Sequence, residues 1–200
     1  NCSSSNTTTF QPGGSPGNVG QCHNGLDSIL DHSEQKIWSG YNSVSYYNWN
    51  NGGNTYSGNT FYAISGTQTA VPGHTSSGLA TNGRGMTAAV LPDGTPVIIV
   101  AHTSNRELYY FNYPSGQYIG YQEHVSGTNN PNNVDYSGLA WDGGSHLLLA
   151  NRGDNYVYAY SLPSSTSAIS SNSINTVAKW SVGHHCQYGM VYGGGNRLYL

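Results

Sequence analysis

The side chains best suited to chemistry recur at one position relative to a repeated dipeptide. Gly-Leu or Gly-Met begins at residues 25, 85, 138 and 189, and three residues before these glycines stand Cys22, Asn82, Asp135 and Cys186. His23, His184 and His185 lie beside them. Carboxylate and amide oxygens are ligands for Ca²⁺, and imidazole is a ligand for Zn²⁺, so convergence of these side chains would make a divalent-metal site. The candidate ligands of such a site are Asp135, Asn82, His184 and His23. We expect no cofactor, with Asn and Asp only capping strand starts and turns, and keep a Ca²⁺ or Zn²⁺ site as the alternative.

The dipeptides mark an internal repeat, with spacings of 60, 53 and 51 residues. The text "VIIVAHTSNRELYYF" (97–111) aligns with "LLLANRGDNYVYAY" (147–160), and "GMVYGGGNRLYL" (189–200) aligns with "GLAWDGGSHLLL" (138–149). A looser copy covers residues 25–49. A period near 50 residues, with several strands in each unit, is typical of a β-propeller blade.

We therefore predict an all-β chain, a β-propeller of four-stranded blades of about 50 residues, with three full blades and the start of a fourth. In the third copy the strands are "GLAWD", "HLLLAN", "YVYAYSL" and "TVAKWSV". The second strand is expected to be buried on both faces, and the alternating third to be half-buried. Turns are expected at "PDG", "DGG", "GDN" and "GGGN", which tolerate positive φ. The predicted division is a flexible Ser/Thr/Gly/Pro-rich tail over 1–21 and blades over 22–78, 79–131, 132–183 and 184–200, the last partial.

The blade text "GLAWD…LLLAN…NYVYAY" resembles the propeller families of the gluconolactonase, NHL-repeat and surface-antigen types, over about residues 25–200. Gluconolactonase-like enzymes place carboxylate and amide ligands for a divalent metal at about the position of Asp135 and Asn82. The resemblance thus implies a metal-dependent lactonase or esterase-type hydrolase at the channel mouth, using Ca²⁺ or Zn²⁺. The sequence departs from that pattern, because Asp135 is the only acid in this ring and no general base is identifiable.

Three cysteines fit an oxidising compartment but leave one unpaired. We favour a Cys2–Cys22 disulfide, which suits a large ring; a Cys22–Cys186 bridge would instead staple a four-bladed ring. The tail holds two N-glycosylation sequons, at Asn1 and Asn6, so glycosylation is expected there. An undecorated linker is the alternative.

The sequence stops at Leu200, in the second strand of the fourth copy. Three arrangements fit: a longer chain of six or seven blades, strands donated by another protomer, or a four-bladed ring with a short last blade. We favour the first.

The composition of the chain argues against nucleic acid and the membrane interior as binding partners. Charged residues are 8% of the chain and the formal charge is −3, so there is no basic patch for nucleic acid. No apolar run approaches the ~20 residues of a membrane helix, so no membrane insertion is expected. A chain that opens on Asn1 is expected of a mature secreted protein.

The chain has 17 tyrosines, and many of them lie in the third strands and in the loops that follow. Half should form the core, and the outward half, with Asn-rich loops, suits sugar stacking or protein contact. The candidate binding residues are Tyr109, Tyr113, Tyr158, Tyr160 and Trp49. "RGD" at 152–154 suits an adhesion receptor or, more simply, a turn. His102, His124 and His146 are interpreted as ordinary polar residues.

These features favour a secreted, non-enzymatic propeller that mediates extracellular recognition or assembly. It would be a surface-layer or filament subunit, with protein partners or further copies of itself, or a glycan-binding module. The metal-dependent hydrolase is the alternative function.

Overall fold

The strands form antiparallel sheets in which neighbours in the sequence are also neighbours in the sheet. The computed structural model describes residues 28–31, 36–40, 43–48, 58–63, 83–102, 107–113, 117–124, 131, 136–151, 153–169, 173–174, 176–182 and 190–199. The predicted tail and every cysteine lie outside these residues.

Three sheets contain four consecutive or nearly consecutive strands each, and we call them blades 1 to 3. Blade 1 has β1 (Ser28–Asp31), β2 (Lys36–Gly40), β3 (Ser43–Asn48) and β4 (Gly58–Ala63). Blade 2 has β5 (Gly83–Val90), β6 (Pro96–His102), β7 (Glu107–Asn112) and β8 (Tyr118–His124). Blade 3 has β9 (Tyr136–Trp141), β10 (His146–Asn151), β11 (Tyr156–Ser161) and β13 (Thr176–Ser181).

A fourth sheet, blade 4, has the two described strands β14 (Val191–Tyr192) and β15 (Leu198–Tyr199). The connection between β11 and β13 holds a 3-10 turn at Thr166–Ala168 and the two-residue strand β12 (Ser173–Ile174), which pairs with β8 of blade 2.

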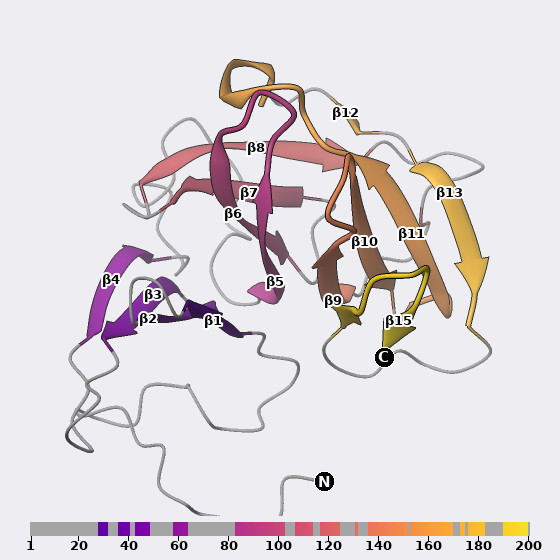
Figure 1. The fold of residues 1–200 in the computed structure, drawn as a ribbon, viewed down its shortest axis with the longest axis horizontal. Helices are drawn as coiled ribbons and strands as arrows, with labels where there is room; N and C mark the ends of the chain where they lie inside the picture. The colour runs from indigo at the N-terminus through magenta and orange to yellow at the C-terminus, as the bar shows by residue number, and fades with distance from the viewer. Residues whose placement is uncertain are drawn as a thin grey trace, which may run out of the picture.

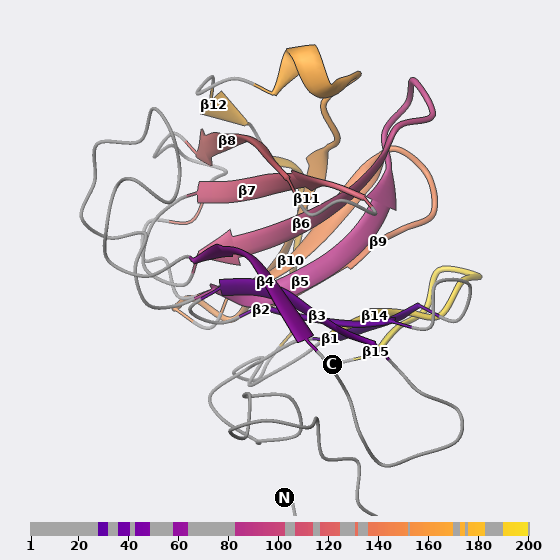
Figure 2. The same cartoon turned by 90° about the vertical axis from the view of Figure 1, so that its left-hand side faces the viewer.

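The sheets stack face to face, and their first strands lie nearest one another. Figure 1 shows the sheets following one another in chain order, and Figure 2 shows them from the side. Strand β5 packs beside β9, and β9 packs beside β14. This is the β-propeller architecture that the repeat predicted, and the strands of the third copy are confirmed.

Glycine allows the first strands of blades 2 and 3 to approach closely. A Cβ atom added to Gly85 would lie 3.0 Å from the carbonyl carbon of Gly138 and from the amide nitrogen of Leu139. Backbone atoms cannot move aside as a flexible side chain would. Packing between blades therefore explains the glycine of the repeated dipeptide in blade 2.

The turns between first and second strands follow the predicted chemistry. Positive φ angles occur at Gly94 (88°), Gly143 (80°) and Gly194 (74°), within the segments expected to turn. The β10–β11 hairpin places Asn155 at φ 63°, and asparagine tolerates this left-handed conformation better than most residues. These turn predictions are confirmed.

Among the described residues, two clusters of buried side chains lie between blades. The larger lies between blades 2 and 3, and its fully or nearly fully buried side chains include Val97, Ile99, Leu108, Tyr110, Tyr136, Leu139, Leu147, Leu149, Tyr158 and Tyr160. The smaller lies between blades 3 and 4, where Ala140, Leu148, Ala150, Val157, Ala159 and Met190 are buried. The second strands β6 and β10 supply side chains to both of their faces, so the prediction that second strands are buried on both sides is confirmed.

The third strands correct one prediction. We expected the alternating sequence of β11 to leave one face toward water, but its residues from Val157 to Tyr160 are all buried. Val157 and Ala159 face blade 4, whereas Tyr158 and Tyr160 face blade 2. Because blade 3 lies between blades 2 and 4, an alternation of small and aromatic residues here distinguishes two buried faces.

Candidate interaction surface

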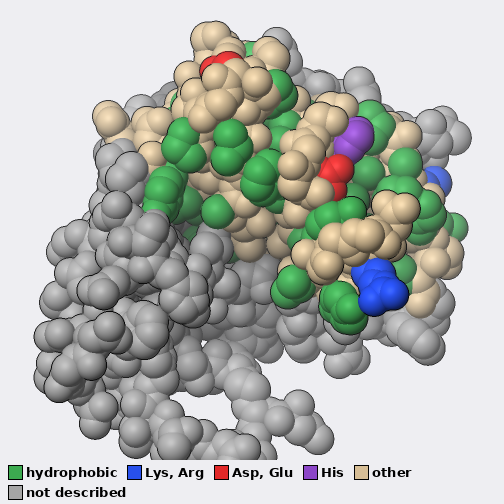
Figure 3. Space-filling view, viewed as in Figure 1, with side chains coloured by type: hydrophobic (Ala, Val, Ile, Leu, Met, Phe, Trp, Pro, Cys, Tyr) green, Lys and Arg blue, Asp and Glu red, His purple; other side chains and the backbone are tan. Residues whose placement is uncertain are grey.

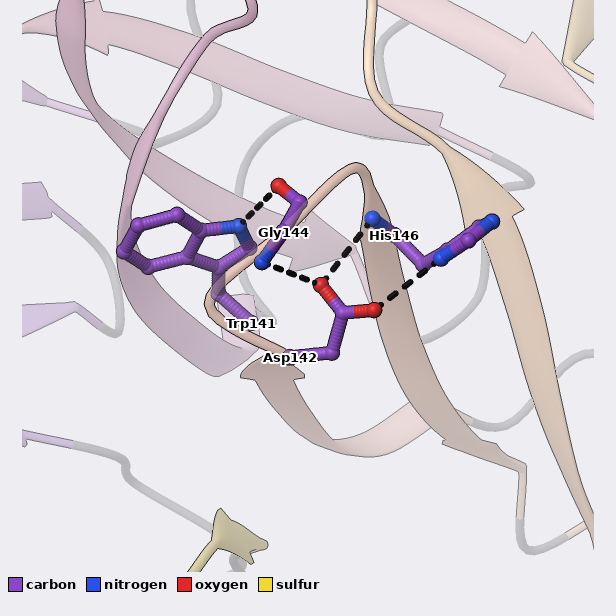
Figure 4. Close-up of polar contacts among 4 residues, drawn as sticks. All are labelled: Trp141, Asp142, Gly144 and His146. Atoms are coloured by element: carbon purple, nitrogen blue, oxygen red, sulfur yellow. Dashed lines mark hydrogen bonds and ion pairs between the residues drawn. The ribbon is translucent and has the colours of Figure 1, made fainter. Parts of the chain in front are cut away.

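A carboxylate organises the turn between β9 and β10. Asp142 Oδ1 accepts hydrogen bonds from the backbone N–H of Gly144 (2.8 Å) and of His146 (3.1 Å), and Oδ2 lies 3.0 Å from His146 Nδ1 (Figure 4). The Trp141 indole donates to the Gly144 carbonyl at 2.8 Å, so the same turn is held from its other side.

The electrostatics of this turn favour the ionised carboxylate. Burial alone would raise the pKa of Asp142, but the N–H groups of Gly144 and His146 and the imidazole outweigh that effect. The pKa of Asp142 is therefore below its usual value. An imidazole oriented through Nδ1 presents Nε2 outward, the arrangement found in acid–base pairs and metal sites.

The equivalent turns of blades 2 and 4 make the same backbone hydrogen bond without such a pair. In blade 2, Leu91 and Thr95 take the places of Asp142 and His146, and the Leu91 N–H donates to the Thr95 carbonyl at 2.8 Å. In blade 4, Gly193 and Arg197 take these places, and the Gly193 N–H donates to the Arg197 carbonyl at 2.9 Å. All the hydrogen bonds of the Asp142 carboxylate stay within its turn. We therefore assign the Asp142–His146 pair to holding the β9–β10 connection.

Asp154 has a comparable role in the β10–β11 hairpin. Its carboxylate accepts a hydrogen bond from the Tyr158 hydroxyl and one from the backbone N–H of Tyr156 at 3.3 Å. Burial raises the pKa of Tyr158, and the neighbouring carboxylate raises it further, so this hydroxyl stays protonated. The acidic residue of the "RGD" tripeptide thus has a structural use, while Arg152 lies outside the described residues.

The described candidate tyrosines are mostly core residues. Tyr109, Tyr158 and Tyr160 are 1%, 2% and 0% exposed, and Tyr113 is half-buried. This placement differs from the outward-facing set that we expected, because blades cover these strands on both sides. Trp49 lies outside the described residues, and ligand binding by any of the five stays a prediction.

Buried tyrosines are accommodated because polar side chains receive their hydroxyls. Tyr110, which is fully buried, donates to Gln122 Oε1 at 2.7 Å, and Tyr109 donates to the carboxylate of the buried Glu107. Burial raises the pKa of Tyr110 well above its usual value. The hydrogen-bonded hydroxyls are consistent with the rule that buried polar groups have partners.

Among the described residues, most of the large exposed apolar side chains lie on the last three strands. Those that are more than half exposed are Val177 and Trp180 of β13, Val191 of β14 and Tyr199 of β15. Val90 of β5 is 40% exposed. Over the described part of the face in Figure 3, hydrophobic side chains are interspersed with backbone and other side chains, and charged side chains are sparse. This surface suits contacts that do not depend on charge.

Val191 and Tyr199 occupy positions that are buried in blades 2 and 3. They pair across β14 and β15, as Ala140 and Leu148 pair across β9 and β10. The blade 3 pair is 4% and 8% exposed beneath blade 4, whereas Val191 and Tyr199 are 63% and 57% exposed. We call the surface formed by Val191 and Tyr199 the open blade face.

The same comparison holds in blade 2. Ala89 and Val97 pair at the equivalent place, are 3% and 0% exposed, and pack toward blade 3. The opposite side of blade 4 behaves as a blade should, since Tyr192 and Leu198 pack against the core that blade 3 presents. The open blade face therefore has the position and composition of a surface between blades.

The predicted metal site lies outside the described residues. The structure does not describe the four candidate metal ligands, which are Asp135, Asn82, His184 and His23. It also does not describe the predicted glycosylation sites and disulfide, which involve Asn1, Asn6, Cys2 and Cys22. Within the part of the chain that the structure describes, no three His, Cys, Asp or Glu side chains form a group able to hold a metal ion. The metal, disulfide and glycosylation assignments stay predictions.

Among the described residues, no helix is both long and apolar enough to cross a membrane. That finding concerns helices within the described ranges alone.

Comparisons with known proteins find similarity in structure only. No family model matches the sequence, and no curated protein is similar enough to match it. The β-propeller domain of Cps50 (Swd1) from Myceliophteria thermophila is 10% identical with a TM-score of 0.45, over 74% of this chain and 41% of that one. A protein from Lactobacillus plantarum is 12% identical with a TM-score of 0.48, over 78% and 42%.

The WD40 repeats of RRP9 are 14% identical with a TM-score of 0.43, over 84% of this chain and 42% of that one. The chain thus spans about two fifths of the length of these solved structures. The propeller architecture itself rests on the strand pairing and the stacking of the blades.

Proposed function

We propose that this protein is a non-enzymatic propeller that recognises or assembles with other extracellular molecules, and that the open blade face is its contact surface. The supporting observation is that Val191 and Tyr199 are exposed, although the equivalent pairs in blades 2 and 3 are buried. A scattered exposed hydrophobic residue is ordinary on a protein surface. Two large ones, paired across strands where a blade normally packs, are a stronger signal of contact.

The open blade face favours a partner that presents another sheet face. In the cores between blades, aliphatic and tyrosine side chains from facing sheets interdigitate without charged groups. A second copy of this chain, or another propeller subunit, offers such a surface. If this face packs on a different face of the next copy, as successive blades do within the chain, the assembly is head-to-tail and builds rings or filaments.

Glycan recognition is the second form of the same proposal. The aromatic ring of Tyr199 on this face, which is more than half exposed, offers a flat apolar surface of the kind that stacks on sugars. The neutral polar composition and the sequons at Asn1 and Asn6 support an extracellular setting.

Light scattering over a wide concentration range tests the assembly. We expect the mass of the full chain to rise with concentration, and we expect a double variant, Val191→Asp with Tyr199→Asp, to stay monomeric. An unpaired charge buried at an interface costs about 3–5 kcal/mol, enough to abolish association of ordinary strength. Val90→Asp is the matched control, because Val90 is also exposed but lies on β5; it should assemble like the parent.

A glycan array with the parent and with Tyr199→Ala tests the second form. Loss of array binding in the variant supports stacking by this ring. A parent protein that stays monomeric throughout and binds no glycan contradicts the proposal.

A further inference from the structure

The connection between β11 and β13 does more than join two strands of blade 3. Part of it, β12, leaves its own blade and pairs in parallel with β8, the outer strand of blade 2, with Ser173 opposite Glu123 and Ile174 opposite His124. The Ile174 side chain is 7% exposed and belongs to the core between blades 2 and 3. Blade 2 thus gains a fifth strand from a neighbouring blade.

The strand β13 is the counterpart of β8 in blade 3. Leu108 of β7 and Val157 of β11 are equivalent, because each pairs with the alanine at the same place in its second strand. Leu108 pairs onward with Gln122 of β8, and Val157 pairs onward with Trp180 of β13. The positions that receive β12 in blade 2 therefore correspond to Ser181 and Val182 in blade 3.

The two outer strands differ in how they are covered. Gln122 is 6% exposed, whereas Trp180 is 52% exposed, although both face the next blade. Ala178 and Val182, on the same side of the strand as Trp180, pack against the core between blades 3 and 4. The uncovered indole therefore continues an interface that is already present.

The outer side of β13 is the edge of its sheet. In the strand order of blade 3 among the described residues, β13 comes last, next to β11. Trp180, on the face toward blade 4, is 52% exposed, and Val177, at the register shift between β11 and β13, is 53% exposed. Two large apolar side chains are therefore exposed along this edge strand.

We propose that the β13 edge at Trp180–Val182 is an acceptor for an extended, uncharged peptide from a partner polypeptide, which adds as a parallel strand. The peptide carries small polar residues and one aliphatic residue, as the segment "SSNSINT" (170–176) does in this chain. The added serine lies opposite Ser181 and the aliphatic residue opposite Val182, in the register that β12 takes on β8. Main-chain hydrogen bonds supply affinity, and the aliphatic side chain beside Trp180 supplies selectivity.

This acceptor uses a different strand from the open blade face, and neither requires the other. The peptide competes with no described strand at β13, since β12 occupies β8 alone. Exposed sheet edges are templates for strand pairing, and natural proteins commonly protect them with charge, proline or a covering segment. The described β13 edge carries one charged side chain, Lys179, and no proline.

The test uses a synthetic, end-blocked "SSNSINT" peptide titrated into the full-length protein. We expect saturable binding, accompanied by slower hydrogen exchange of the β13 amides. Trp180→Ser should weaken binding about tenfold or more, as expected for the loss of a central aromatic contact. A peptide with Ile→Asp should not bind. Val90→Asp should bind like the parent, because Val90 lies on β5.

Backbone pairing has its own control. Two peptides N-methylated at alternate amides keep their side chains, but one of them loses the donors that face β13, so the two should differ sharply in affinity. Equal binding by both, equal binding to Trp180→Ser, or no saturable binding by the parent overturns the proposal. The double variant Val191→Asp with Tyr199→Asp should still bind the peptide, which separates this result from that of the assembly test.

Discussion

Replacing Asp142 with alanine should destabilise the fold through one turn. The carboxylate holds two backbone N–H groups, at 2.8 and 3.1 Å, and an imidazole nitrogen at 3.0 Å. Each hydrogen bond contributes about 0.5–1.5 kcal/mol, and the partial exposure of this turn keeps each near the lower end. The expected loss is about 1–2 kcal/mol, or about 2–8 °C in Tm for a chain of this size.

Thermal or urea unfolding at neutral pH measures the loss, and Asp93→Ala is the matched control. Asp93 lies in the equivalent turn of blade 2 but accepts one hydrogen bond, from the backbone N–H of Thr95 at 2.9 Å, at an exposed position. Its removal should cost about 0.5 kcal/mol or less. Equal losses in the two variants would refute the assignment of Asp142 to holding its turn.

The pH dependence gives the same prediction a second readout. Because the pKa of Asp142 is lowered in the folded state, its contribution is present above the ordinary carboxyl pKa of about 4 and is lost as the pH falls through the lower folded value. The stability difference between the parent and Asp142→Ala should therefore be largest near neutrality and shrink in acid. A difference that is unchanged at low pH would contradict the electrostatic part of the reasoning.

Three further changes test the packing of the blades. Gly85→Ala should lower the free energy of urea unfolding by about 1–3 kcal/mol, because the new Cβ would meet backbone atoms at 3.0 Å. Gly144→Ala is the control: its Cβ would have its nearest neighbour at 3.4 Å, so the loss should be about 0.5 kcal/mol or less. Similar losses in the two variants would contradict the close approach of β5 and β9. Asp154→Ala should lower the free energy of unfolding by about 1–3 kcal/mol, because it leaves the hydroxyl of the buried Tyr158 without its carboxylate partner. Adding Tyr158→Phe should recover part of this loss. No recovery would show that the loss does not come from the Tyr158 hydroxyl. Ile174→Asp should speed amide hydrogen exchange in β8, because it removes the packing that holds β12 on that strand. Ser167→Asp, at an exposed position in the same connection, should leave this exchange unchanged. Unchanged exchange in Ile174→Asp would show that β12 does not protect the β8 edge.

The sequence predicted the blades because the repeat brings local signals into agreement. Apolar runs such as "HLLLAN" define the second strands, and Gly94 and Gly143 mark turns that need positive φ. Each signal spans a few residues, and its recurrence at a fixed period distinguishes it from chance. The fold was therefore available without any long-range information.

Burial of the third strands was not predictable from alternation alone. The pattern from Tyr156 to Tyr160 looks half-polar, because tyrosine carries a hydroxyl. In the structure, Asp154 receives the Tyr158 hydroxyl, and the rings of Tyr158 and Tyr160 stack at 6.2 Å between blades. Whether a tyrosine lies inside depends on a partner for its hydroxyl, and that partner comes from tertiary structure.

The two proposed contact surfaces were even harder to predict from the sequence. A two-residue strand such as β12 leaves no periodic pattern, so its pairing with β8 appears only in three dimensions. Trp180 and Tyr199 resemble core residues in the sequence and are exposed because of what lies beside them. The Asp142–His146 pair had a local signal, a carboxylate four residues before an imidazole across a glycine turn, but His146 was interpreted as an ordinary polar residue.

Hydroxyl-radical footprinting of Tyr199, compared between dilute and concentrated protein, tests the central claim most directly. If the open blade face is the contact surface, oxidation of Tyr199 and Val191 should fall several-fold as the mass measured by light scattering rises, while oxidation of Val90 stays constant. Assembly that leaves Tyr199 as reactive as in the dilute protein would contradict the account.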